Sequence, residues 1–214
     1  FEEVLKALES AQQFIHIEYY IFDDDVIGNK IIDILKRKAD EGISVRFIYD
    51  DFGSHGLNSS TIAAMREVGI QVFPFYEVKF YLLANRLNYR NHRKIIIVDG
   101  WIGFTGGINV SDKYVNNGHP EKLYWRDTHV KIEGSAVNSL QYHFIANWNF
   151  CTDETLDINR TYFPNLFEKK EGYEDLVHIV AGGPDYPSSS IMISFFTAIV
   201  TAKEKVYITS PYFI

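Results

Sequence analysis

Apolar residues along the first 75 positions alternate between helical spacing and short continuous runs. Helical spacing predicts helices at residues 2–12, 28–40 and 59–68. The short runs, which are typical of strands, lie at residues 14–22, 45–50 and 71–75. Because each of these strands is separated from the next by a helix, we expect the three strands to be parallel in an α/β fold.

A β-hairpin is predicted where two apolar runs meet at an Asp-Gly pair. Asp99 and Gly100 form the turn, so that residues 93–98 pair with residues 101–106. A further strand at 124–132 extends the sheet, and a helix follows at residues 135–150. The expected fold is α/β, a mixed and largely parallel β-sheet flanked by helices.

The first strand of this hairpin brings two reactive side chains to one face. His92 and Lys94 have the same parity, and therefore point the same way. A two-residue turn places Lys94 opposite Thr105 and His92 opposite Gly107, which leaves open space for a substrate. Asn109 lies two residues beyond Gly107 on the same face, within reach of an oxygen held by Lys94.

An imidazole, an ammonium and an amide suit chemistry at phosphorus. Lysine and asparagine donate to phosphate oxygens, and an imidazole can attack phosphorus and hold the phosphoryl group covalently. A buried lysine beside a histidine, with no carboxylate nearby, is electrostatically unfavourable unless an anion binds at the site. Each residue alone has an ordinary structural explanation, and for Asp99 that explanation, a turn former, is the favoured one.

These residues match a known signature. HxKxxxxD followed by GGxN, formed by His92, Lys94, Asp99, Gly106, Gly107 and Asn109, resembles the HKD signature of the phospholipase D superfamily. The surrounding segments are similar to the bacterial cardiolipin synthase branch, and the resemblance spans nearly the whole chain. They read FIHIEYYIF (14–22), VRFIYDDFGS (45–54), LNYRNHRK (87–94) and WRDTHVKIEG (125–134). The resemblance implies a phospholipase D-like αβα sandwich.

The resemblance also implies roles for the site residues. His92 would be the nucleophile that forms a phosphohistidine, in a catalytic set with Lys94, Asp99 and Asp127. Lys94, Asn109 and Gly107 would bind the substrate phosphate. The chemistry of the family needs no metal and no cofactor.

Two acidic residues are candidates for orienting His92. The resemblance favours Asp127, within the predicted strand 124–132, whose carboxylate would hold the imidazole tautomer. An ion pair with Arg126, or a surface position, is an equal alternative. Glu18 is a weaker candidate for the same pocket, since a buried carboxylate needs partners.

Superfamily members assemble their site from two facing HKD motifs, and this chain contains one complete signature. Residues 1–150 resemble a first catalytic half, and residues 151–177 a connector. Residues 178–214 resemble the start of a second half, because the segment 202–214 is similar to 11–22. The resemblance implies a chain that ends before the second motif and is inactive alone. A longer chain or a homodimer would supply the missing half.

Charge and composition limit the classes of molecule that the chain is expected to bind. The net charge of −7 disfavours a nucleic-acid partner. Arg86, Arg90, Arg93 and Lys94 form a local cationic strip that suits a phosphate headgroup. The single cysteine, Cys151, excludes an intrachain disulfide and is expected to be a small buried residue.

The resemblance places the parent protein at the bacterial cell membrane, through segments that precede this chain. No apolar run here reaches the roughly 18 residues of a membrane span, so this part is expected to be soluble. Residues 73–87 are aromatic and apolar enough to touch a membrane surface. A strand with a core-packing connector is the favoured explanation for them.

Metal binding has one weak candidate. Asp50 and Asp51 end a strand, where α/β proteins place functional carboxylates. Adjacent acids on a strand point to opposite faces, so loop capping with Ser54 is favoured over a magnesium site.

The expected function is phosphatidyl transfer that makes cardiolipin from two phosphatidylglycerol molecules. One alternative is a phosphodiesterase with water as acceptor, completed by dimerisation. The other is a non-catalytic half that binds anionic lipid.

Overall fold

The protein forms two compact units, Phe1–Val177 and His178–Ile214. The computed structural model describes residues 1–75, 91–116, 121, 123–167, 172, 175–183, 186 and 189–210. The sheet and the predicted site residues all belong to the first unit.

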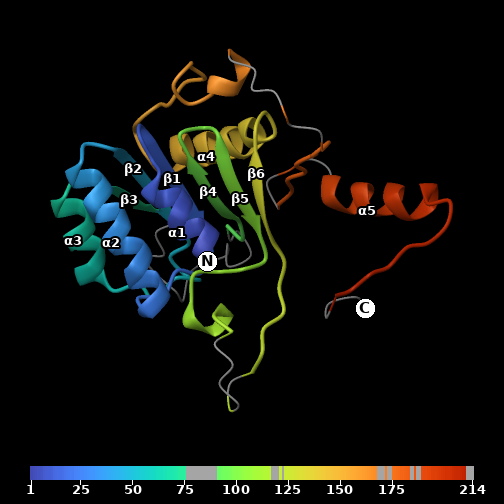
Figure 1. Cartoon of the computed structure of the whole chain (residues 1–214), viewed down its shortest axis with the longest axis horizontal. Coiled ribbons are helices and arrows are strands. Elements are labelled where there is room, and N and C mark those ends of the chain that lie inside the picture. Colours follow the sequence, from blue (N-terminus) through green and yellow to red (C-terminus); the bar gives the residue numbers. More distant parts are fainter. Residues whose placement is uncertain are drawn as a thin grey trace. The chain divides into compact units, whose positions relative to one another are not determined.

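One six-stranded sheet, in the order β3-β2-β1-β4-β5-β6, forms the centre of the first unit (Figure 1). Its strands are β1 (Phe14–Tyr19), β2 (Ser44–Tyr49), β3 (Gln71–Pro74), β4 (Lys94–Val98), β5 (Ile102–Gly106) and β6 (His129–Glu133). The β1–β2 and β2–β3 pairs are parallel, and the β1–β4, β4–β5 and β5–β6 pairs are antiparallel. The predicted mixed sheet is confirmed, with its parallel part confined to the first three strands.

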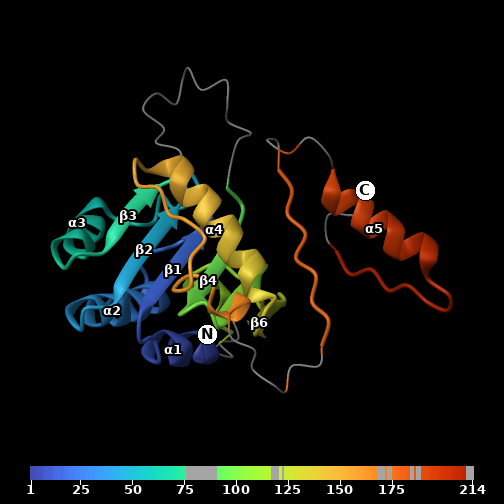
Figure 2. The same ribbon diagram turned by 90° about the horizontal axis from the view of Figure 1, so that it is seen from above.

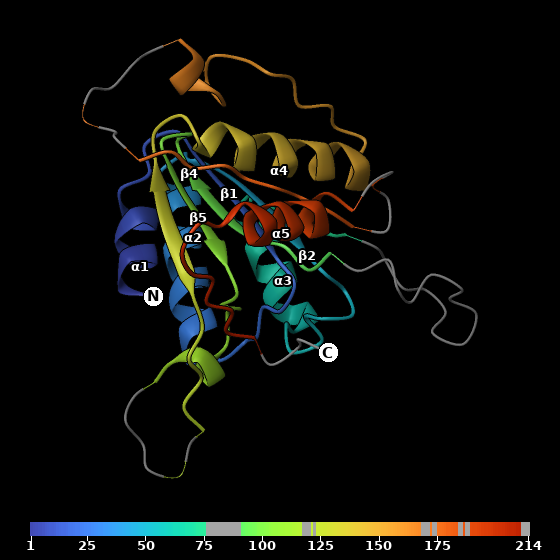
Figure 3. The same ribbon diagram turned by 90° about the vertical axis from the view of Figure 1, so that its right-hand side faces the viewer.

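Helices cover both faces of this sheet. One face packs against α1 (Glu2–Glu9), α2 (Val26–Asp40) and α3 (Ser59–Glu67), and the other against α4 (Val137–Cys151) (Figures 2 and 3). Two 3₁₀ helices, η1 (Asp112–Tyr114) and η2 (Pro164–Leu166), lie in the connections. The αβα sandwich is confirmed.

Side-chain alternation along β1 explains the two layers. Ile15 and Ile17 enter the apolar core shared with α1, α2 and α3. His16 points to the opposite face, where its ring stacks on Phe144 of α4 at a centroid distance of 4.3 Å. Because β1 is covered on both faces, all six of its residues are buried, including Glu18.

The predicted hairpin exists, but its register is shifted by one residue. Asp99 and Gly100 both have positive φ, 52° and 68°, as expected for a tight Asp-Gly turn. Trp101 also belongs to the connection, because Val98 pairs with Ile102. The predicted pairing of Lys94 with Thr105 is therefore wrong.

The corrected register changes the predicted partners of the two reactive residues. Ile95 pairs with Thr105. Lys94 is consequently in line with Gly106, at the end of β5, and the predicted position of His92 opposite Gly107 is also displaced by one residue.

The strand predicted at 124–132 is shorter than expected. It begins at His129, so Asp127 precedes the strand rather than lying within it. The Asn116 side chain donates to the Trp125 carbonyl at 2.7 Å and accepts from the Trp125 N–H at 3.0 Å. These are the backbone groups that a longer β6 would need for its ladder.

The second unit contains α5 (Ser190–Thr201). None of the α5 residues is buried, although most are apolar. Residues 202–210 belong to the segment that resembles 11–22, but they form no strand, and Tyr207 there is 86% exposed. Of the helices that the structure describes, none has both the length and the apolar character to cross a membrane.

Candidate active site

His92 and Lys94 lie together at one end of the sheet, as predicted. His92 lies two residues before the start of β4 and is exposed, whereas Lys94 is the first residue of β4 and is only 5% exposed. The Lys94 ammonium donates to the His92 carbonyl at 2.8 Å and lies 3.1 Å from His92 Nδ1. The lysine thus holds both the backbone and the ring of the histidine.

Tyr20 packs against both residues of this pair. Its ring centroid lies 4.0 Å from that of His92, and Lys94 Nζ lies 5.2 Å from the Tyr20 centroid. An aromatic face beside an ammonium stabilises the charge without neutralising it. Sequence reasoning missed Tyr20, although its place directly after β1 offered a signal.

Burial lowers the pKa of Lys94 to about 8, and the negative charges of Asp127 and Asp50 oppose this change. An ammonium removed from water is poorly solvated, so an anion that reaches it gains a strong partner. The environment of Lys94 therefore suits a substrate that carries its own negative charge.

Asn109 is buried, and its side-chain amide is engaged by protein groups. Its Nδ2 donates to the Tyr114 hydroxyl at 2.7 Å, and its Oδ1 accepts from the Ile21 N–H at 3.3 Å. One Nδ2 hydrogen is sufficient for the bond to Tyr114, so the second is available to an oxyanion. Tyr114 is a further site neighbour that sequence reasoning missed.

Asp127 is exposed and approaches the backbone at Gly107. Its Oδ1 accepts from the Thr128 N–H at 2.7 Å. A Cβ built on Gly107 would collide with the Asp127 carboxylate. Asp127 also raises the pKa of Lys94, which puts its charge within the electrostatic reach of the site.

His129, at the start of β6, is a third ring in this region that sequence reasoning left without a role. Burial lowers its pKa to about 4, the charge of Lys94 acts in the same direction, and Asp127 opposes them. The ring is therefore neutral at physiological pH. Its place opposite Gly106 gives it contact with the end of β5.

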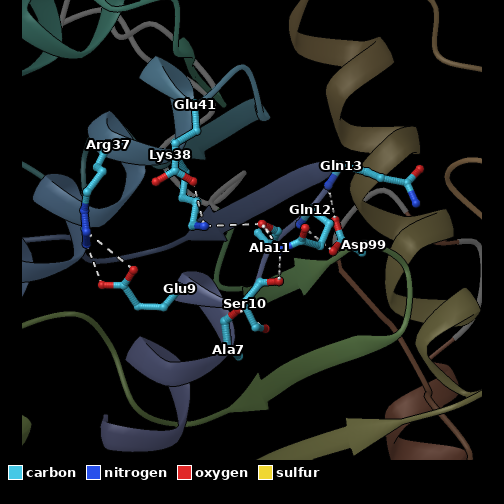
Figure 4. A network of polar contacts seen from close by, with 10 residues as sticks. All are labelled: Ala7, Glu9, Ser10, Ala11, Gln12, Gln13, Arg37, Lys38, Glu41 and Asp99. Carbon is cyan, nitrogen blue, oxygen red and sulfur yellow. Dashed lines mark hydrogen bonds and ion pairs between the residues drawn. The ribbon is translucent and has the colours of Figure 1, made fainter.

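Asp99 lies away from these residues, at the opposite end of β4. It lies five positions along the chain from Lys94, a distance of about 16 Å for extended backbone. Its carboxylate accepts from the N–H groups of Gln12 and Gln13, each at 2.8 Å (Figure 4). It also accepts from the Phe14 N–H at 2.9 Å. The structure thus gives Asp99 a structural role, as a turn former that also fixes the start of β1.

Glu18 is fully buried on the α4 face of β1. Its Oε1 accepts from Asn147 Nδ2 at 2.5 Å and from Asn91 Nδ2, and Arg93 Nη1 lies 4.0 Å away. Burial raises the pKa of Glu18 to about 7, against the opposing effects of Arg93 and the two amides. Sequence reasoning found the buried charge but missed both asparagines.

Asp50 connects the end of β2 to the residue before His92. Its Oδ1 accepts from the N–H groups of Phe52 and Gly53 at 3.1 and 2.7 Å, and its Oδ2 accepts from the Asn91 N–H at 2.9 Å. The predicted loop capping is confirmed. Ser54 does not bond the Asp50 carboxylate but donates its N–H to the Asp50 backbone oxygen. Across the described residues, no group of three or more His, Cys, Asp or Glu is arranged to hold a metal ion.

The remaining predicted features have mixed outcomes. Of the cationic strip, Arg93 and Lys94 are described, whereas Arg86 and Arg90 lie outside the described residues, as does most of 73–87. Cys151 is a free, half-buried thiol at the end of α4. Burial raises the pKa of this thiol to about 12, and Glu18 contributes in the same direction.

A family model described as "Cardiolipin synthase, PLD-like domain" matches residues 4–146, a stretch that contains the His92 and Lys94 pair. The chain belongs to this family. Its sandwich, its HKD strand and the buried lysine are therefore features of a cardiolipin synthase phospholipase D-like domain.

Curated relatives agree with this assignment. The cardiolipin synthase of Alkalihalophilus pseudofirmus is 42% identical over 214 residues, which cover 100% of this chain and 42% of the relative. Cardiolipin synthase 2 of Staphylococcus epidermidis is 41% identical over 216 residues, covering 100% of this chain and 43% of the relative. The chain thus spans less than half the length of these relatives.

Solved structures share the fold at low sequence identity. NucT from Helicobacter pylori superposes with a TM-score of 0.54 and 21% identity, over 71% of this chain and 88% of that one. Phosphatidylserine synthase from Haemophilus influenzae superposes with a TM-score of 0.51 and 14% identity, over 68% of this chain and 33% of that one. They confirm the αβα architecture of the cardiolipin synthase domain.

Proposed function

We propose that this chain supplies one catalytic half of a phosphatidyltransferase that makes cardiolipin and glycerol from two phosphatidylglycerol molecules. The observation that carries the proposal is the 42% identity to a cardiolipin synthase along the entire chain. The contact between Lys94 and His92 supports it, because it places a nucleophile beside a phosphate-binding ammonium.

In the first step, His92 attacks the phosphorus of one phosphatidylglycerol. The phosphate draws the Lys94 ammonium from Nδ1 to a phosphate oxygen, so that Nδ1 carries the imidazole proton and Nε2 presents its lone pair. A bond forms between Nε2 and phosphorus, and the bond from phosphorus to the glycerol headgroup oxygen breaks. That oxygen takes a proton from a general acid and leaves as glycerol.

In the second step, a hydroxyl of the other phosphatidylglycerol attacks the phosphohistidine and loses its proton to the same group. Cardiolipin leaves, and His92 is restored. Lys94 and Asn109 hold the phosphate oxygens throughout, with the Gly107 backbone alongside. The Asp127 carboxylate stabilises the positive charge that develops on His92.

The general acid belongs, in this proposal, to a second phospholipase D-like half. Residues 151–177 act as a connector, and 178–214 begin that half. A longer chain or a second copy completes the site, and segments outside this chain hold the parent protein at the bacterial cell membrane. The single HKD signature and the 42% coverage of a full-length relative support this arrangement.

The test is to extend the chain to the length of its relatives and incubate it with phosphatidylglycerol labelled at phosphorus. Acid-sensitive label on His92, with cardiolipin and glycerol accumulating and both lost in His92→Ala, would establish the transferase. Phosphatidic acid as the product would show that water is the acceptor. A folded protein that gives neither labelled histidine nor a lipid product would refute catalysis at His92.

A further inference from the structure

Both neighbours of His92 along the chain interact with one buried carboxylate. Asn91, directly before it, donates its side-chain amide to Glu18 Oε1. Arg93, directly after it, places Nη1 4.0 Å from the same oxygen. His92 itself faces the site, so Glu18 acts on the backbone that presents the imidazole rather than on the ring.

Asn91 closes a small turn around His92. Its Oδ1 accepts from the Arg93 N–H at 3.2 Å, which is the side-chain-to-backbone bond of an Asx turn. His92 is the central residue of that turn. Because Oδ1 is occupied by Arg93, the amide must direct Nδ2 outward, and Glu18 is the acceptor that Nδ2 reaches. The turn and the carboxylate thus fix the same side chain from two directions.

The position of Glu18 makes this anchor rigid. It lies on the central strand β1, opposite Ile48 of β2 and Ile95 of β4. Asn147 of α4 donates to the same oxygen as Asn91. A carboxylate in such a place costs free energy that an apolar side chain would not. Docking α4 alone would need only an apolar residue, which leaves the bond to Asn91 as the specific function.

We propose that Glu18 is a positioning residue for the nucleophile, which anchors the Asx turn of Asn91 and thereby sets the orientation of His92. The inference rests on the proposed function, because His92 is a nucleophile only within it. Glu18 touches neither substrate nor His92, so it is not a catalytic residue.

Exchanging donor and acceptor tests the contact without changing side-chain volume. Asn91→Asp keeps an oxygen for the Arg93 N–H but turns a second oxygen toward Glu18. Two acceptors then meet at pH values above the Glu18 pKa of about 7, where both carboxyl groups are ionised, and the variants are compared there. Glu18→Gln in the same chain supplies the missing N–H. The Asn147 side-chain amide can rotate by about 180° so that its oxygen accepts from the introduced amide. The double variant therefore restores the anchor with its polarity reversed.

The measurement is the rate at which diethyl pyrocarbonate acylates His92, followed by mass spectrometry of the 214-residue chain. The exposed His178 of the second unit serves as an internal reference for the reagent. Rates are taken over a range of pH, so that orientation is separated from protonation. Because no lipid is present, this assay does not depend on whether the parent protein makes cardiolipin.

Asn91→Asp is expected to slow acylation of His92 about tenfold, as a small misplacement of a reacting group does, and the double variant to recover most of the loss. His16→Gln is the matched control. It changes a buried polar residue on the same face of β1, which contacts Gln141 of α4. It is expected to leave the His92 rate unchanged.

Three results would overturn the proposal: an unchanged rate in Asn91→Asp, a double variant as slow as Asn91→Asp, or an equal loss in His16→Gln. If Asn91→Asp fails to fold, Asn91→Ser provides an equivalent test. Its hydroxyl still accepts from the Arg93 N–H but is too short to reach Glu18, so the same slowing is expected.

Discussion

The Asp127 carboxylate fills the space that a side chain on Gly107 would occupy. The second glycine of the GGxN segment therefore keeps an acidic group against the backbone of the site. This contact joins two residues that lie 20 positions apart, at the two ends of the connection between β5 and β6.

Gly107→Ala is expected to displace Asp127 and to lower kcat of the proposed full-length transferase by roughly 10–100-fold, the order seen when a supporting charge is lost. If the loss arises through Asp127, then Gly107→Ala and Asp127→Asn will not be additive. Steady-state kinetics of both single variants and the double variant check this. Multiplicative losses would mean that the two residues act separately.

Oxyanion binding is expected to weaken above pH 8. Lys94 loses its proton near this pH, because burial lowers its pKa to about 8, and each further unit should reduce affinity about tenfold. Sulfate is a suitable probe since it does not titrate in this range, and calorimetry from pH 6.5 to 10 gives the affinity. Lys94→Arg remains charged throughout, so its curve should be flat. A flat curve for the unaltered chain would contradict the buried-ammonium interpretation.

Asp99→Asn is expected to reduce stability without affecting the chemistry of His92. Asparagine tolerates the positive φ of this position but loses the charge that strengthens three hydrogen bonds. The loss should be about 1–3 kcal/mol in chemical denaturation. Acylation of His92 by diethyl pyrocarbonate should stay as in the parent. Slower acylation of His92 at unchanged stability would show that Asp99 acts on the active site.

The stability of the Glu18→Gln variant should increase, relative to that of the parent, as the pH rises. Burial raises the folded-state pKa of Glu18 from 4.5 to about 7, so the folded protein holds an extra proton between these values. The stabilisation that the raised pKa of Glu18 gives to the folded state is complete below pH 4.5 and is lost as the pH rises through 7. The free energy of unfolding changes by about 3 kcal/mol at most.

Chemical denaturation at pH 4.5, 6 and 8 measures this difference. Glu67→Gln, the same exchange at an exposed position of α3, is the matched control. A difference between parent and Glu18→Gln that does not change with pH would show that Glu18 keeps one protonation state throughout.

Local patterns in the sequence were sufficient for the layers of the fold. Apolar spacing predicted three helices of the first unit, and the Asp-Gly pair predicted the hairpin. The register failed because one extra residue, Trp101, joined the connection. Side-chain period cannot reveal such a shift when both strands are mostly buried, since either register leaves apolar residues on both faces.

The site was predictable only where its residues are close in sequence. His92 and Lys94 lie two positions apart, and their alternation along a strand was enough to place them together. Asn147 lies 129 positions from Glu18, and the two meet only because α4 packs on β1. An asparagine in a helix gives no local signal of such a contact.

The central place of β1 has a consequence for how the proposed full-length enzyme would lose activity on heating. β1 is paired on both sides, and its six residues are buried, so its amide hydrogens should exchange with solvent only when the whole first unit unfolds. Through Glu18, the turn that holds His92 is tied to this slowest-exchanging strand. Heat inactivation should therefore coincide with global unfolding rather than precede it.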